Sequence, residues 1–141
     1  MLIWIFMLLA AFGFLVSLYF TLVYYKLMVP DAKFVPSICQ LSEETCWTIL
    51  STREARVLGV PNFLLGLIYY LGLITLGAFG LIHASTPGFE ALMTISLFTV
   101  LLGVYLTYSL LSKLRVVCVL CIASHVINVF IAMILYSFWF F

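Results

Sequence analysis

Four long apolar runs dominate the sequence, and the first of them, residues 1–25, contains no charged side chain. About 20 consecutive apolar residues suffice to cross the hydrocarbon core of a bilayer as an α-helix. The runs predict spans at about residues 2–26, 61–82, 90–111 and 117–139. Because backbone polar groups in lipid must find internal partners, the sequence predicts an all-α membrane protein, a bundle of four transmembrane helices.

The composition also indicates a membrane protein, since 67% of the residues are hydrophobic and only 8% are charged. Soluble domains have about a quarter of their residues charged. A net charge of +1 argues against nucleic acid as a partner. The first run lacks a preceding basic segment and is too long for the apolar core of a signal peptide, so we expect it to be retained. We expect one membrane domain over residues 1–141.

Small residues recur on the first run, where Ala10, Gly13 and Ser17 follow one another at helical spacing. Side chains of this size let two membrane helices approach closely. The sequence therefore predicts that this face of the first span packs against another helix.

Most of the acidic residues lie between the first two spans, in a loop at about residues 29–60. Ser42 is a plausible N-cap for one short helix, because serine side chains accept hydrogen bonds from the first turn. The run from Ser51 to Glu54 has the pattern of a capping box, which predicts a second short helix that ends at Gly59. We expect a structured cap over the bundle. A solvated connector is the alternative.

A Cys-x-x-Cys motif, Cys118 to Cys121, lies at the start of the last span. Helix positions three apart share a face, and the N-terminus of a helix stabilises a thiolate. His125 and Asn128 fall on the same side, within roughly 80° of the two cysteines at about 100° per residue. The motif predicts a reactive polar stripe on an apolar helix. The alternative is a purely structural role, in which the two cysteines are buried and pack as small hydrophobic residues.

An even number of spans brings the Cys-x-x-Cys motif to the same membrane face as the second cysteine pair, Cys39 and Cys46. Two dithiols at one face favour serial thiol–disulfide exchange, and a lipid-soluble quinone is the natural electron acceptor inside a bilayer. Asn62 and His125 lie at a depth where they could hydrogen-bond the quinone oxygens, in an otherwise apolar site. We predict that Leu65 contacts the quinone as well.

Two other readings of the cysteines stay open. A zinc site would use the Cys-x2-Cys motif, but the six residues between Cys39 and Cys46 exceed the usual spacing of two to four. We therefore expect no metal. Two static disulfides that brace a membrane scaffold are the other reading.

The order of these motifs resembles the vitamin K epoxide reductase family, especially its microbial homologues. The resemblance covers essentially the whole chain, with four spans, a loop cysteine pair and a late Cys-x-x-Cys. Its residues are Cys39 and Cys46, then Ser51-Thr52, then Leu58-Gly59-Val60-Pro61-Asn62 with Gly66, and finally Cys118-Val119-Leu120-Cys121. Other four-span quinone-linked oxidases carry the two cysteine pairs in the reverse order.

The resemblance implies roles by position. Cys118 would receive electrons from the loop pair, and Cys121 would face the quinone. Asn62 matches the family asparagine that binds a quinone oxygen. Thr52, beside Ser51, stands where the family usually has a serine that supports the loop cysteines.

One position departs from the animal enzymes, which have a tyrosine at the quinone where this chain has His125. This departure bears on which quinone is used and on whether an epoxide is a substrate. Many microbial members carry a fused thioredoxin-like domain. This chain ends after its fourth span, so we expect the thioredoxin-like partner to be a separate protein.

The resemblance implies a membrane thiol–quinone oxidoreductase that supports disulfide bond formation. Electrons would pass from the thioredoxin-like partner through Cys39 and Cys46 to Cys118 and Cys121, and on to a quinone of the ubiquinone or menaquinone type. The alternative is a reductase of vitamin K quinone or of its epoxide.

Two arguments disagree on the orientation in the membrane. Family habit places the cysteine face outside the cytoplasm, where disulfides are normally made. The positive-inside rule places it in the cytoplasm, because all six basic residues lie at or near that face. They are Lys26, Lys33, Arg53, Arg56, Lys113 and Arg115. Between the two, we expect the charge rule to hold.

Overall fold

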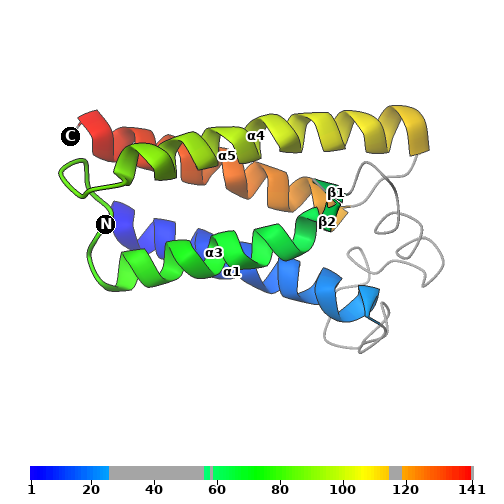
Figure 1. Ribbon diagram of the computed structural model, residues 1–141, viewed down its shortest axis with the longest axis horizontal. Helices are drawn as coiled ribbons and strands as arrows, with labels where there is room; N and C mark the ends of the chain where they lie inside the picture. The colour runs from blue at the N-terminus through cyan, green and yellow to red at the C-terminus, as the bar shows by residue number, and fades with distance from the viewer. Residues whose placement is uncertain (26–55, 58, 115–118, 141) are drawn as a thin grey trace.

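Four helices form one bundle in the computed structural model of the protein (Figure 1). They are α1 (Leu2–Tyr24), α3 (Asn62–Ala78), α4 (Phe89–Ser109) and α5 (Val119–Phe140). The structure describes residues 1–25, 56–57, 59–114 and 119–140. Both chain termini lie at one end of the bundle, and α3 and α5 both begin at the opposite end (Figure 1).

Three helices in the described part of the chain are long and apolar enough to cross a membrane: α1, α5 and α4 extended to Ser112. The fourth, α3, is equally apolar in character but has 17 residues. At 1.5 Å per residue it is about 25 Å long, slightly less than the roughly 30 Å hydrocarbon core. The protein is therefore a helical membrane protein, while the count of four spans stays a prediction.

The second predicted span is wrong in its last turn, because α3 ends at Ala78 and not near residue 82. Gly80 adopts a left-handed φ of 65°. Its N–H donates to the carbonyl oxygen of Gly77 at 3.1 Å, and the N–H of Leu81 donates to that of Leu76 at 2.9 Å. This pair of bonds is the Schellman motif, which satisfies the last carbonyls of a helix and turns the chain out of it.

The short helix predicted to end at Gly59 is wrong in its last residues. Arg56–Val57 form strand β1, which pairs antiparallel with β2, Val60–Pro61. Gly59 has a φ of 82°, and a glycine in this region suits the two-residue connection of a hairpin. The predicted cap over residues 29–55, with Ser42, otherwise lies outside the described residues.

The third predicted span agrees with α4, which begins at Phe89 after Gly88 and carries Glu90 in its first turn. Lys113, however, still belongs to helical backbone, two residues beyond the predicted end of this span at about residue 111. The helix continues through a π-helical turn, Leu110–Leu114, a feature often found near functional sites.

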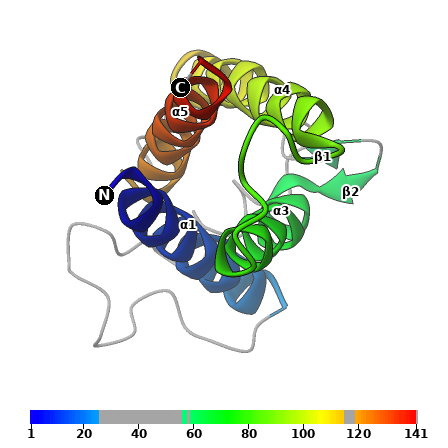
Figure 2. The same cartoon turned by 90° about the vertical axis from the view of Figure 1, so that its left-hand side faces the viewer.

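The close packing expected of the first span is confirmed in the contact between α1 and α3. Gly13 faces the ring of Tyr70 directly. One turn further along, a Cβ atom on Gly66 would lie 2.9 Å from the Oγ of Ser17. Both positions need small residues, because a larger side chain would force these helices apart. Seen along the bundle, α1, α3, α4 and α5 follow one another around it (Figure 2).

We expect Gly13→Ala to lower the free energy of unfolding by about 1–3 kcal/mol, the usual cost of overpacking. The added methyl group would meet the ring of Tyr70, which is only 2% exposed and has little room to move. Gly72→Ala is the control, since nothing lies within 4 Å of a Cβ atom there. Thermal unfolding in detergent measures both. Equal stability of the two variants would contradict the packing argument.

Candidate active site

A cavity of about 510 Å³ lies inside the bundle and is lined by all four helices. Its size is in the range of small-molecule sites, which are mostly apolar with a few polar anchors. Its walls follow this pattern. The polar lining residues are Ser17, Asn62, Tyr69, Tyr70, Thr99, Ser109, Cys121, Ser124, His125 and Asn128.

Cys121 is the sulfur-bearing residue of this lining, and it is disulfide-bonded. It lies in the first turn of α5 and packs against an apolar cluster that includes Val16, Phe63 and Leu110. The hydroxyl of Ser124 donates to the carbonyl oxygen of Cys121 at 2.8 Å. A half-buried disulfide sulfur at a cavity wall is placed to exchange electrons with a molecule bound in the cavity.

The other predicted cysteines, Cys39, Cys46 and Cys118, lie outside the described residues, as do Ser51 and Thr52. Among the described residues, no three His, Cys, Asp or Glu side chains come together. The expectation that the cysteines bind no metal therefore remains a prediction.

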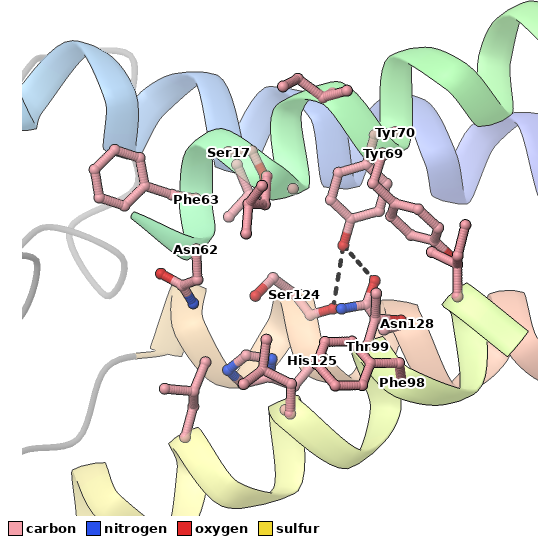
Figure 3. A pocket seen from close by; sticks show the side chains of 18 of the residues that line it. Ser17, Asn62, Phe63, Tyr69, Tyr70, Phe98, Thr99, Ser124, His125 and Asn128 are labelled. Carbon is pink, nitrogen blue, oxygen red and sulfur yellow. Dashed lines mark hydrogen bonds between the residues drawn. The ribbon is translucent and has the colours of Figure 1, made fainter. Parts of the chain in front are cut away.

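Asn62 is the first residue of α3, at the same end of the bundle as Cys121 (Figure 1). Pro61 precedes it with φ −57° and ψ 134°, an extended geometry that turns the chain into the helix. Figure 3 shows the amide of Asn62 among the cavity side chains with no hydrogen bond to the others drawn. Leu65 follows one turn later and also lines the cavity. An amide in this position is available to a bound molecule.

His125 lies one turn after Cys121 and reaches across to α4. A Cβ atom on Gly103 would lie 2.9 Å from its Nδ1 and 3.1 Å from its Cγ, so the ring fits only because that residue is glycine. The Nδ1 atom is buried and has no hydrogen-bond partner in the described part of the chain. Because buried N–H groups without an acceptor are rare, the tautomer with its proton on Nε2 suits this position. That N–H can then donate to a ligand.

The structure thus brings together five of the residues that the sequence singled out: Asn62, Leu65, Cys121, His125 and Asn128. It adds residues that sequence reasoning missed. The hydroxyl of Tyr70 donates to Oδ1 of Asn128 at 2.6 Å, and it lies 3.5 Å from the carbonyl oxygen of Ser124 (Figure 3).

Tyr69, beside Tyr70, was missed as well. Its hydroxyl lies 2.7 Å from Oγ of Ser96, which links α3 to α4. The available signal was two adjacent tyrosines in the middle of an apolar run, since polar groups inside a membrane need partners. No local sequence pattern identifies those partners, because they lie 27 and 58 positions away.

Comparison with known families finds a match along nearly the whole chain. The model of the vitamin K epoxide reductase family matches residues 4–136. The matched segment contains nearly all of α1 and α5 and the whole of α3 and α4.

We expect Gly103→Ala to destabilise the protein and His125→Ala to relieve most of that loss when the two are combined. The reason is the contact between the position of the Gly103 Cβ atom and the imidazole. Residues in direct contact show coupling energies of about 0.5–3 kcal/mol in double-mutant cycles. The free energy of unfolding of the two single variants and the double variant measures this coupling. Additive effects would mean that glycine at this position does not position the ring.

Proposed function

Because the chain belongs to the vitamin K epoxide reductase family, we propose that it is a membrane thiol–quinone oxidoreductase that supports disulfide bond formation. The family is one of membrane oxidoreductases whose activity is linked to quinones. The single observation that carries the proposal is the cavity that joins the disulfide-bonded Cys121 to Asn62 and His125. A quinone in this cavity would lie beside the redox-active sulfur, with its oxygens near two hydrogen-bond donors.

The net reaction transfers two electrons and two protons. A dithiol on a partner protein becomes a disulfide, and the quinone becomes a quinol. In the proposed route, partner thiols reduce the disulfide of Cys39 and Cys46 by exchange. The loop dithiol then reduces the disulfide of Cys118 and Cys121. The resulting dithiol, with Cys121 nearest the ring, gives two electrons and two protons to the quinone, and the disulfide between Cys118 and Cys121 re-forms. Ser51 and Thr52 support the loop cysteines in this scheme.

Asn62 and His125 have the chemistry to stabilise the reaction. Reduction places negative charge on the two quinone oxygens before they are protonated. Donors that are already positioned around such charge, in a site without bulk water, lower its cost. The amide of Asn62 and the Nε2–H of His125 serve as these donors, and Leu65 packs against the ring. The donors present therefore fit a quinone headgroup.

The lateral face of the cavity supports a lipid-soluble substrate. Leu65 and Ile68 on α3, and Ile95 and Phe98 on α4, line the cavity and are also exposed on the outer surface of the bundle. In the described residues, α3 and α4 make few direct contacts compared with the other neighbouring helices. A molecule dissolved in the bilayer would therefore reach the cavity between α3 and α4.

We include α3 as the fourth span, in a single membrane domain over residues 1–141.

The partner in this proposal is a separate thioredoxin-like protein, and neither nucleic acid nor a metal takes part. The quinone is of the ubiquinone or menaquinone type. The second candidate function is reduction of vitamin K quinone or its epoxide, which the family description favours. Assays of the purified chain with each acceptor, with a dithiol as the reductant, decide between the two.

We expect Cys118→Ser and Cys121→Ala each to abolish quinone reduction. The first change removes the sulfur that accepts electrons from the loop pair, and the second removes the thiolate beside the ring. Reduction by a dithiol substrate, followed by the loss of quinone absorbance, measures turnover. Ser137→Ala, on α5 outside the cavity, is the control. Activity near that of the unchanged protein in either cysteine variant would refute the relay.

We expect Asn62→Ala to weaken quinone use about tenfold. Loss of one hydrogen bond costs roughly 0.5–1.5 kcal/mol, and 1.4 kcal/mol corresponds to a factor of ten. Thr75→Val on the same helix is the matched control, because its hydroxyl donates to the carbonyl oxygen of Leu71 and does not line the cavity. An apparent quinone affinity that is unchanged in Asn62→Ala would place the quinone elsewhere.

For the orientation, we expect the face with Cys121 to lie in the cytoplasm and both termini outside, as the charge rule predicts. A reporter fused after Phe141 measures this directly. Activity of a reporter that works only outside the cytoplasm supports the prediction. Activity of a reporter that works only in the cytoplasm would restore the orientation usual for the family.

A further inference from the structure

The cavity continues well past the site of the proposed reaction. Along α3 it extends from Asn62 past Tyr70, and along α5 from Cys121 to Asn128. At 1.5 Å per residue, Tyr70 lies about 12 Å deeper in the bundle than Asn62, and Asn128 about 10 Å deeper than Cys121. A second group of polar side chains therefore lies deeper in the cavity than the redox-active sulfur, by at least the length of a quinone headgroup.

We call this group the inner polar cluster and define it as Tyr69, Tyr70, Thr99 and Asn128. The hydroxyl of Tyr70 donates to Oδ1 of Asn128, which fixes the orientation of the amide. The two N–H donors of that amide are not used by this bond. Because Asn128 lines the cavity, they are available to an acceptor inside it. Figure 3 shows Tyr69, Tyr70, Thr99 and Asn128 gathered at one end of the cavity and Asn62 at the other.

Among the apolar side chains that line the cavity, the two most exposed lie at the level of the inner polar cluster. Ile68 is 69% exposed and directly precedes Tyr69, and Phe98 is 55% exposed and directly precedes Thr99. Both also line the cavity. A molecule that enters from the bilayer between these two side chains therefore meets the inner polar cluster before it reaches Cys121.

We propose that the inner polar cluster is a second binding site for the quinone headgroup, occupied as the quinone enters and as the product leaves. The identity of the occupant rests on the proposed function. A carbonyl oxygen that leaves the membrane surface for an apolar passage loses its hydrogen bonds, which is unfavourable unless they are replaced. The amide of Asn128 replaces one of those bonds on the way to Asn62.

The double variant Tyr70→Phe with Asn128→Leu tests the site while it preserves packing. Removing both partners of a buried hydrogen bond can be nearly neutral for stability, whereas removing one leaves the other unsatisfied. In the full chain in lipid nanodiscs, with a short-chain benzoquinone, we expect kcat/KM to fall about tenfold and kcat to stay unchanged, because the reacting residues are intact. The control combines Tyr105→Phe with Thr75→Val, two exposed polar residues outside the cavity.

A second measurement does not depend on turnover. An azidobenzoquinone that crosslinks on illumination should label residues near Tyr69 and Asn128 as well as residues near Asn62, as mapped by mass spectrometry of peptides. The double variant should lose only the first set. A second variant, Tyr69→Phe, keeps the bond between Tyr70 and Asn128. It should lower the labelling near Tyr69 and Asn128 without abolishing it.

Labelling near Asn62 alone would overturn the proposed second site. An unchanged kcat/KM in the double variant would also overturn it, and so would a fall in both kcat and kcat/KM. Labelling at both levels without any quinone reduction by the unchanged protein would instead refute the proposed function and still support the second headgroup site.

Discussion

The side chain of Tyr70 contacts three of the four helices, and the shape of the cavity depends on the packing of its ring. Its ring lies against Gly13 of α1, its backbone belongs to α3, and its hydroxyl donates to Asn128 of α5. Such a bond across helices is favoured in an apolar bundle, where an unpaired hydroxyl would find no water. With α1, α3 and α5 in contact in this way, α3 and α4 form the least closely packed side of the bundle among the described residues.

The helix pairs of the bundle differ in how closely they pack. The contacts of α1 with α3, of α4 with α5 and of α1 with α5 are extensive, whereas α3 and α4 meet at few points. One of these is the contact between the hydroxyls of Tyr69 and Ser96. A cavity that must admit a lipid-soluble molecule needs one weak seam, because a bundle that is packed closely on all sides would exclude it.

Glycine at position 103 has a similar packing role beside His125. It gives the imidazole of His125 room to lie between α4 and α5, at a depth where a side chain on α4 would otherwise project. The cost is a buried Nδ1 atom without a partner among the described residues. The gain is an imidazole held one turn from Cys121, with its second nitrogen free to face the cavity. Departures of this kind from full hydrogen bonding are expected mainly at functional sites.

The sequence by itself determined the class of the protein. Long runs without charge permit only helices in a bilayer, and the spacing of Cys121 and His125 puts them on one face of a helix whatever the helix packs against. The predicted helix ends near residues 59 and 80 were wrong. Each position is near a glycine with a left-handed φ. Glycine adopts positive and negative φ about equally readily, so the local sequence does not decide its conformation. Only the tertiary structure decided that Tyr70 reaches Asn128, that Gly103 receives His125 and that all four helices line one cavity. The periodicity of a helix defines its own faces, but the choice of neighbour for each face depends on how whole helices pack, which no single segment encodes.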